Sequence, residues 1–458
     1  MMDWNTLISA KRFGLEEFHK ERHENRSEFQ RDYDRLIFSA PFRRLQNKTQ
    51  VFPLPGSIFV HNRLTHSLEV SCVGRSLGND VAKAILARRP ELQDSYLPEI
   101  GSIVSAACLA HDLGNPPFGH SGERAISTFF SEGKGLALKE KQPDGEQLTP
   151  AQWEDLTHFE GNANAFRLLT HQFEGRRKGG FVLTYSTLAS IVKYPFSSSL
   201  AGQKSKFGFF TTEEESFRRI AEELGMKQLN GSPLKYARHP LVQYIARTVY
   251  LLERYLCAML VGRGRPFGDM LDETSLKFPF QYLYFVIEEC PGAFADKQPD
   301  DGRTQIGYLF IGVAHNLERV EDVRLTFVGK VGQQQVLRFL RSENLQFVGI
   351  FNIHHLVADV ICRFYQHCAE VSFKKIYRSR DVLDIELAGF RIISTLLELM
   401  IDAVRSPEKA YSQLLINRVS GQYNMKATAL YERIQAVLDY ISGMTDVFAL
   451  DLYRKHAN

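Results

Sequence analysis

The spacing of apolar residues limits what this chain can fold into more than any other feature of its sequence. Apolar side chains recur at intervals of three and four along most of the chain, and the strict alternation of a half-buried strand is rare. In segment 65–89, for example, Leu68 and Cys72 are four residues apart, and Leu77, Val81 and Ile85 recur every four residues. This periodicity predicts an all-α protein.

Further helices are expected wherever the same spacing continues between polar or glycine-rich breaks. They lie near residues 121–131, 158–174, 213–225, 240–260, 353–370, 385–405 and 426–442. Glycine, proline and charge mark loops at 133–150, 175–180, 197–212, 262–274 and 291–307. Because none of these loops has the composition of an interdomain linker, we expect one large domain over residues 1–458. Its core is expected at about 36–260 and its C-terminal helical part at about 340–458.

Composition narrows the class of protein. The chain has 458 residues, of which 44% are hydrophobic and 24% charged, as in an ordinary folded soluble protein. A net charge of +3 gives no global basic field for nucleic acid, although the basic clusters at 42–48 and 175–180 could bind phosphates. Such a charge run is more often only a solvated surface.

The cysteines and the N-terminal residues indicate the compartment. The six cysteines are scattered mostly among apolar neighbours and form no CxxC pair, which indicates reduced thiols rather than a disulfide framework. The first residues lack the apolar core of a signal peptide, and no apolar run reaches the roughly 18 residues that a membrane span needs. We therefore expect a cytoplasmic protein that does not enter a membrane.

A small set of polar residues stands at the end of an otherwise apolar segment. Residues 101–110 should form a helix buried on nearly all sides, and it reaches His111 and Asp112 just before Gly114 stops it. Because helix neighbours diverge by about 100°, these two side chains can share an ion only near a helix end, with a third ligand from another element. His66, at the start of the preceding helix, is the natural third ligand.

Two imidazoles and one carboxylate suit a divalent metal. Mn²⁺, Fe²⁺, Co²⁺ and Zn²⁺ accept this set of donors, and Mg²⁺ would do so if water and substrate oxygens completed its coordination. A bare His-Asp pair is usually incidental, but one that ends a buried apolar helix and is followed by GNPPFGH is a far stronger signal. The sequence leaves the identity of the metal open.

Acid–base and phosphate-binding groups accompany these ligands. His120 and Glu123 are three residues apart on an expected helix, so the carboxylate can orient the imidazole for general acid–base catalysis. The alternative is a surface ion pair of negligible energy. Arg63, one turn before the first ligand, could hold phosphate oxygens bidentately. For Lys193 and Tyr194, contact with a nucleotide and a simple helix end before a proline are equally good interpretations.

Seven stretches of the chain together resemble the bacterial dGTP triphosphohydrolase-like proteins of the HD superfamily. They are SAPFRRLQNKTQVFPL (39–54), NRLTHSLEV (62–70), AHDLGNPPFGHSGE (110–123), HFEGNANAFRLL (158–169), LKYARHPL (234–241), IELAGFRIISTLLELMIDA (385–403) and DYISGMTDVFALDLYRK (439–455). The resemblance implies an all-α HD-domain phosphohydrolase fold with a helical C-terminal extension. It also implies hydrolysis of a deoxynucleoside triphosphate to the nucleoside and inorganic triphosphate.

The resemblance assigns catalytic roles residue by residue. It places His66, His111 and Asp112 on the metal, and His120 with Glu123 at proton transfer at the α-phosphate. Whether His120 acts on the attacking water or on the leaving 5′-oxygen is not fixed by the sequence.

The resemblance also implies substrate contacts and partners. It places Gln46 at the sugar, Arg63 at the α-phosphate, His158 near the reaction centre, and Lys193 and Tyr194 along the nucleotide site. It further suggests a homo-oligomer, either a hexamer or a tetramer, and activation by a deoxynucleoside triphosphate or single-stranded DNA at separate sites.

One segment departs from the family pattern. After HPL the family carries an aspartate pair that supplies the fourth metal ligand, but Val249 and Tyr250 occupy these places here, and the likeness stays patchy over about 242–372. Either Glu253, one turn on, supplies the ligand, or the metal site is defective, as in a regulatory or binding relative. The third explanation is that this segment belongs to an engineered or wrongly assigned sequence, which the abrupt break between well-matched flanks favours.

Three functions are consistent with these observations. The leading one is metal-dependent hydrolysis of a deoxynucleoside triphosphate, with dGTP as the expected substrate. The second keeps the HD site but acts on another nucleotide, such as a cyclic or alarmone nucleotide, although the long matches at both ends of the chain argue against it. The third is a catalytically impaired nucleotide- or nucleic-acid-binding protein, which only Val249 and the basic clusters support.

Overall fold

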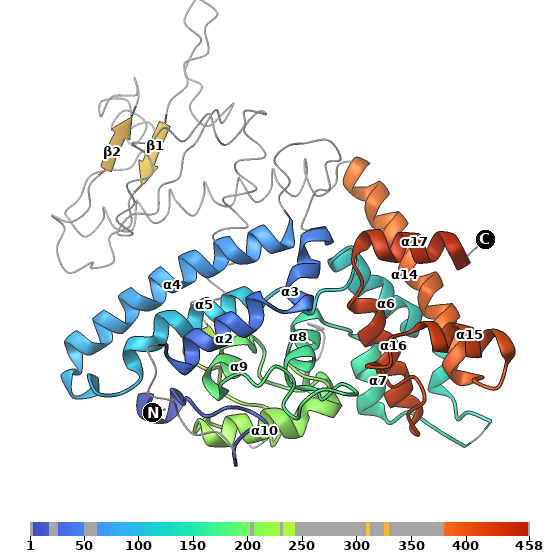
Figure 1. Cartoon of the computed structure of the whole chain (residues 1–458), viewed down its shortest axis with the longest axis horizontal. Coiled ribbons are helices and arrows are strands. Elements are labelled where there is room, and N and C mark those ends of the chain that lie inside the picture. The colour runs from blue at the N-terminus through green and yellow to red at the C-terminus, as the bar shows by residue number, and fades with distance from the viewer. Residues whose placement is uncertain are drawn as a thin grey trace, which may run out of the picture. The chain divides into compact units, whose positions relative to one another are not determined.

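The computed structural model of the chain describes two long stretches, one up to residue 242 and one from residue 380 (Figure 1). The described residues are 3–17, 26–49, 62–143, 145–201, 206–229, 232–242, 308–311, 325–328 and 380–456. The chain divides into two compact units, the first comprising residues 1–250 with 380–458 and the second residues 251–379. The single large domain expected from the sequence stays a prediction.

The first unit is built almost wholly from helices. Its N-terminal part contains α1 (Trp4–Leu7), α2 (Glu28–Ile37), α3 (Ala40–Arg44), α4 (Arg63–Arg88), α5 (Ile100–Ala110), α6 (His120–Ser131), α7 (Pro150–Thr157), α8 (Gly161–Thr170), α9 (Tyr185–Ile191) and α10 (Glu214–Glu223). Its C-terminal part contains α14 (Arg380–Arg405), α15 (Ala410–Arg418), α16 (Leu430–Ser442) and α17 (Asp446–His456). The predicted mostly helical fold is confirmed. Among the described helices, none combines the length and the apolar character needed to cross a lipid bilayer.

Two strands are described in the second unit. β1 (Tyr308–Ile311) pairs antiparallel with β2 (Leu325–Val328), with Tyr308 opposite Val328. The sequence did not predict this pair, because runs of four residues are too short for apolar spacing to separate a strand from a helix.

Helix boundaries follow local capping as well as apolar spacing. α8 begins at Gly161 rather than at residue 158, because the Glu160 side chain accepts the backbone N–H of Asn162 at 2.7 Å and caps the helix there. Two predicted loops contain short 3₁₀ helices, η4 (Lys134–Lys139) and η5 (Ser198–Leu200). Other 3₁₀ helices are η1 (Leu45–Asn47), η2 (Pro90–Leu92), η3 (Leu97–Glu99) and η7 (Thr211–Glu213). The elements expected at 262–274, 291–307 and 353–370, and most of 240–260, lie outside the described residues.

Helix α5 is the centre of the N-terminal part. Every residue from Ile103 to Ala110 is buried, and α5 packs against α2, α4 and α9 (Figure 1). α4 can lie close to it because residue 78 is glycine and has no β-carbon. A β-carbon at this position would stand only 2.8 Å from the Cα of Gly101. At the other end of α4, Asn62 forms a capping box that fixes where the helix begins. The ends of α4 and α5 that carry the predicted metal ligands are therefore held by packing and capping.

The C-terminal helices share a hydrophobic core with α6. α14 packs against α6, α15, α16 and α17. The core joins Phe130 of α6 to Leu397 of α14 and Ile434 of α16, all of which are buried. Helices from distant parts of the sequence therefore form one continuous structure within the first unit.

A buried ion-pair network links α8 to α16. The Arg167 guanidinium donates to the Asp439 carboxylate through Nη2 at 2.8 Å and to the Glu213 carboxylate through Nη1 at 2.7 Å. The three side chains are between 3% and 6% exposed. A charge left without its partner at this depth would be strongly destabilising.

We predict that Asp439→Ala lowers the free energy of unfolding by about 3–5 kcal/mol, because it leaves the buried guanidinium of Arg167 with one carboxylate fewer. Urea unfolding followed by circular dichroism measures this change. The matched control is Asp451→Ala, since the Asp451 side chain is 50% exposed and pairs with the exposed Lys455. That control should change stability by less than about 1 kcal/mol. Equal losses in the two variants would contradict the prediction.

The buried His239 predicts a dependence of stability on pH. Its side chain is 1% exposed, its Nε2 donates to the carbonyl of Leu7 at 3.1 Å, and burial lowers its pKa from 6.5 to about 4. As the pH falls through this range, the unfolded chain takes up a proton that the folded chain does not. The free energy of unfolding should therefore fall from pH 6.5 towards pH 4, by up to about 1.4 kcal/mol per pH unit.

His239→Gln should reduce this dependence and leave the part that comes from His171, whose pKa burial also lowers to about 4. His456→Gln near the C-terminus should retain the full dependence. Urea unfolding curves collected at several pH values would measure both variants beside the parent protein. If His239→Gln and the parent lose stability equally as the pH falls, the assignment to His239 is wrong.

Candidate active site

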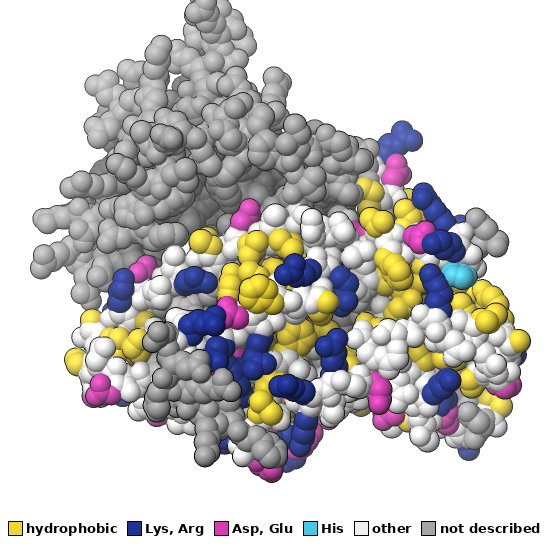
Figure 2. All heavy atoms as spheres, viewed as in Figure 1, with side chains coloured by type: hydrophobic (Ala, Val, Ile, Leu, Met, Phe, Trp, Pro, Cys, Tyr) yellow, Lys and Arg dark blue, Asp and Glu magenta, His cyan; other side chains and the backbone are white. Residues whose placement is uncertain are grey.

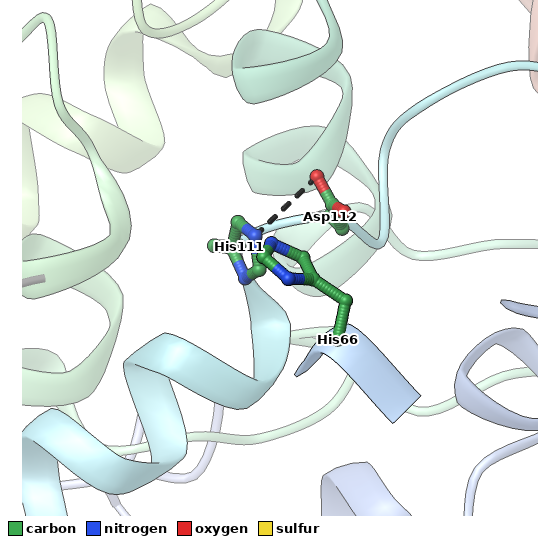
Figure 3. Close-up of side chains that lie close together, drawn as sticks. All are labelled: His66, His111 and Asp112. Carbon is green, nitrogen blue, oxygen red and sulfur yellow. Dashed lines mark ion pairs between the residues drawn. The ribbon is translucent and has the colours of Figure 1, made fainter. Parts of the chain in front are cut away.

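The three predicted metal ligands converge in the structure. His66 extends from the beginning of α4, and His111 and Asp112 directly follow the last residue of α5 (Figure 3). One ligand atom from each residue lies within 4.8 Å of the other two. Two donors that bind one ion at about 2.1 Å are at most about 4.2 Å apart, so small side-chain movements are enough to bring all three ligand atoms onto one ion.

Local contacts orient the two imidazoles. The Nδ1 atom of His111 lies 2.7 Å from the carbonyl oxygen of Cys108, and its Nε2 lies 3.5 Å from Oδ1 of Asp112. A hydrogen bond from Nδ1 to a backbone carbonyl leaves Nε2 unprotonated and available to a metal. The fully buried His66 meets His111 edge-on, with the ring centroids 5.3 Å apart.

Asp112 is held as a carboxylate. Arg63 donates to Oδ2 through Nη1 at 2.9 Å, and the Asn115 amide donates to Oδ1 at 2.6 Å. Burial disfavours the charged form, but electrostatic interactions with His111, Arg63 and His66 outweigh burial and hold the pKa of Asp112 well below its usual range. The carboxylate is therefore charged at neutral pH, as a metal ligand must be.

These side chains fit a divalent metal. They supply two nitrogen donors and one oxygen donor within reach of a common point, and a catalytic metal centre keeps further positions for water and substrate. The positions considered for a fourth protein ligand, Val249, Tyr250 and Glu253, lie outside the described residues.

His120 and Glu123 form the predicted pair at the start of α6. The Nδ1 atom of His120 donates to Oε2 of Glu123 at 2.9 Å, and the backbone N–H of Gly161 donates to the other carboxylate oxygen at 2.9 Å. The imidazole is 79% exposed and the carboxylate only 10%. The hydrogen bond to Glu123 raises the pKa of His120 and favours the imidazolium. The imidazolium of His120 is therefore accessible to solvent and is oriented by the buried carboxylate of Glu123.

Lys206 belongs to the same neighbourhood, although the sequence did not predict it. Its Nζ pairs with the Glu160 carboxylate at 2.5 Å. It also lies close enough to His120 and Glu123 to influence the pKa of each, and it interacts electrostatically with Tyr194. The surrounding sequence, SKFGFF, contains no motif. Only the tertiary structure reveals this residue.

For Gln46 and His158, the structure shows no contact as specific to the predicted role as those of the metal ligands. Gln46 lies exposed in η1. His158 ends α7, and its Nδ1 pairs with the Glu154 carboxylate at 3.0 Å. His158 is not part of the cluster of ligand atoms formed by the three metal-binding candidates. Their roles at the sugar and at the reaction centre stay predictions.

Two cations flank Tyr194. The Lys193 Nζ lies 5.5 Å and the Arg238 Cζ 5.7 Å from the centroid of its ring. Arg238 falls within one of the seven family-like stretches, but the sequence did not distinguish it from its neighbours. Together with the nearby Lys206, these groups place positive charge around an aromatic ring, an arrangement that can contact phosphate oxygens and a planar base.

Basic side chains also gather on one face of the first unit. Figure 2 shows Lys and Arg side chains concentrated over α2 and α3. Arg44 and Arg176, from the two basic clusters noted in the sequence, both lie close enough to Tyr423 to influence its pKa. Arg35 and Arg177 interact electrostatically in the same way. One arginine of each cluster therefore lies near Tyr423, although the clusters are far apart in the sequence.

Two family models match the chain. The HD domain matches residues 63–184, which contain His66, His111, Asp112 and the His120–Glu123 pair. The phosphohydrolase-associated domain matches residues 366–455, which include the C-terminal helices. HD domains are a fold of phosphohydrolases, and the converging histidine and aspartate side chains are consistent with the metal dependence of that fold.

Similar proteins cover nearly the whole chain. A deoxyguanosinetriphosphate triphosphohydrolase-like protein of Pseudomonas aeruginosa is 34% identical, over 99% of this chain and 98% of its own length. One from Synechocystis is 34% identical over 99% of both chains. A deoxyguanosinetriphosphate triphosphohydrolase of Yersinia enterocolitica is 29% identical, over 99% of this chain and 98% of its own. The chain therefore belongs to the deoxyguanosinetriphosphate triphosphohydrolase-like family of HD-domain phosphohydrolases, as its sequence motifs predicted.

Proposed function

We propose that this protein hydrolyses a deoxynucleoside triphosphate, with dGTP as the expected substrate, to the deoxynucleoside and inorganic triphosphate in a metal-dependent reaction. The observation that carries the proposal is the convergence of His66, His111 and Asp112 beside Arg63 and close enough to His120 for an electrostatic interaction. The names of the relatives support the choice of dGTP.

The proposed reaction is attack of water on the α-phosphorus. The water oxygen loses a proton to solvent and bonds to phosphorus, the bond to the 5′-oxygen breaks, and the 5′-oxygen takes up a proton from His120. A divalent ion on the three ligands would polarise a phosphoryl oxygen and make a water easier to deprotonate. Mn²⁺, Mg²⁺, Fe²⁺, Co²⁺ and Zn²⁺ all remain candidates.

Arg63 and His120 supply the remaining chemistry in this proposal. Arg63 is 4% exposed, so its guanidinium can stabilise charge on the α-phosphate with little screening by water. His120 donates a proton to the leaving 5′-oxygen, a role that its raised pKa favours over removal of a proton from water. Glu123 keeps the imidazole in position throughout.

Other groups complete the proposed nucleotide site. Lys193 and Arg238 are suited to the outer phosphates and Tyr194 to the sugar or base. Gln46 is proposed at the sugar and His158 near the reaction centre. A hexamer or tetramer and an effector site for a deoxynucleoside triphosphate or single-stranded DNA are further proposals from family likeness. A cytoplasmic location is proposed from the scattered cysteines. The basic face over α2 and α3 supports a site for a polyanion.

We predict that the purified protein with Mn²⁺ releases inorganic triphosphate from dGTP faster than from the other three deoxynucleoside triphosphates, as ion chromatography would show. Asp112→Asn should lower this release more than about 100-fold, because loss of a residue that only supports a metal ligand already costs roughly 10–100-fold. Asp451→Asn on the exposed surface of α17 is the matched control. Phosphodiester cleavage without triphosphate would indicate another nucleotide substrate, and binding without turnover would indicate an impaired enzyme.

We predict that His120→Gln lowers kcat by about 10²–10⁴-fold, with little change in KM or bound metal, because His120 transfers a proton but holds neither metal nor substrate. Glu123→Gln removes the group that raises the pKa of His120. The alkaline limb of its kcat–pH profile should therefore move to lower pH. A Glu123→Gln enzyme whose profile is unmoved on both limbs would contradict the assigned pair.

A further inference from the structure

The turn that precedes His120 has an unusual backbone. Phe118 and Gly119 have φ angles of 61° and 57°, in the left-handed region, and α6 begins at the next residue. A bulky residue such as phenylalanine is strained there and stays only when its surroundings hold it. At Gly119, a β-carbon would lie 2.4 Å from Nη2 of Arg63. The direction in which His120 leaves this turn therefore depends on what holds Phe118.

Asp446, the first residue of α17, holds Phe118 by a hydrogen bond. Its Oδ1 accepts the backbone N–H of Phe118 at 2.9 Å. Its Oδ2 accepts the backbone N–H of Thr49 at 2.7 Å and the Thr49 hydroxyl at 2.5 Å. Thr49 forms a β-bridge with Asn62, which caps α4. One carboxylate thus ties the strained turn to the segment that leads to Arg63 and His66.

Helix α14 receives the side chain of Phe118. A β-carbon on Gly389 would lie 2.6 Å from Cγ and 2.7 Å from Cβ of Phe118, so only glycine leaves room for the ring. Nearby on α14, the carbonyl of Glu386 accepts the hydroxyl of Ser121 at 2.9 Å. The C-terminal helices therefore hold the turn through its backbone, its ring and the first residues of α6.

Lys48 ties the other end of the same loop to the C-terminal part. Its buried Nζ donates to the carbonyl oxygens of Asn115 at 2.6 Å and Ser442 at 2.7 Å. The loop that runs from Asp112 to His120 is thus attached to residues 442–446 at two points. These attachments involve groups that the proposed reaction does not use.

We propose that Asp446 and Gly389 are positioning residues, which hold Phe118 and Gly119 in the left-handed turn that aims His120 at the substrate. The inference deepens the proposed function and rests on it. It assigns a role to the YISGMTD stretch and to α14, whose family-like sequences the catalytic groups leave unexplained. In this role the C-terminal helices act on proton transfer, whereas metal binding remains with α4 and α5.

Two variants test this role by different routes. Asp446→Ala removes the hydrogen bond to Phe118, and Gly389→Ala displaces its ring without removing any hydrogen bond. The matched controls are Asp451→Ala on the exposed side of α17 and Gly421→Ala, where a β-carbon would meet nothing within 4 Å. Using both variants keeps the test meaningful if Asp446→Ala fails to fold.

The readouts are hydrogen–deuterium exchange by mass spectrometry, kcat, KM and bound Mn²⁺, all on the full chain. Both variants should speed exchange in peptides spanning 116–121 by about tenfold or more and leave α9 unchanged. They should lower kcat by about tenfold or more while KM and bound Mn²⁺ stay within about twofold of the parent. The controls should match the parent in every readout.

Several outcomes would overturn the inference. Unchanged exchange at 116–121 in the folded variants would show that Asp446 and Gly389 do not hold the turn, whatever the activity. Faster exchange with an undiminished kcat would show that the turn is held but does not position His120. Parallel losses of kcat, of bound Mn²⁺ and of protection from exchange in α9 would indicate that the two residues only stabilise the fold. If the parent protein itself hydrolyses no deoxynucleoside triphosphate, the proposed function fails, and exchange alone then decides whether Asp446 and Gly389 hold the turn.

Discussion

The end of one buried helix is the constraint on which the candidate site depends. α5 is mostly apolar and buried as far as Ala110, and the next two residues are polar. Polar side chains at the edge of such a core need partners, because burying them without partners is costly. His111 finds the Cys108 carbonyl, and Asp112 finds Arg63 and Asn115. Since α4 packs tightly against α5, His66 reaches the same point, and three ligands from two helices can bind one ion.

The C-terminal helices contribute to this site without supplying a metal ligand among the described residues. The backbone N–H of Gly161, the first residue of α8, donates to the Glu123 carboxylate. Arg167 of the same helix pairs with Asp439 and so connects α8 to α16. A few residues further on, Asp446 reaches the turn before His120. In the proposed role, the phosphohydrolase-associated segment is part of the structure that orients His120 and Glu123. This role would give a physical reason for the family motifs at both ends of the chain.

The sequence predicted the groups that stand out against their surroundings. His111 and Asp112 interrupt an apolar helix, and metal chemistry then required a third ligand such as His66. Contacts that depend on tertiary structure were not predictable in this way. Lys206 lies in a stretch without a motif, and the hydrogen bond between Asp446 and Phe118 spans 328 residues. The left-handed turn at Phe118 was also hidden, because phenylalanine rarely adopts that conformation and gives no local signal for it.

The central claim is that His66, His111 and Asp112 bind one divalent cation. Anomalous diffraction from crystals grown with Mn²⁺, collected on both sides of the manganese absorption edge, tests it most directly. The geometry predicts one strong peak about 2.0–2.3 Å from an imidazole nitrogen of each histidine and from a carboxylate oxygen of Asp112. A peak at another group of side chains, or full loading with His66 out of reach of the ion, would contradict the claim.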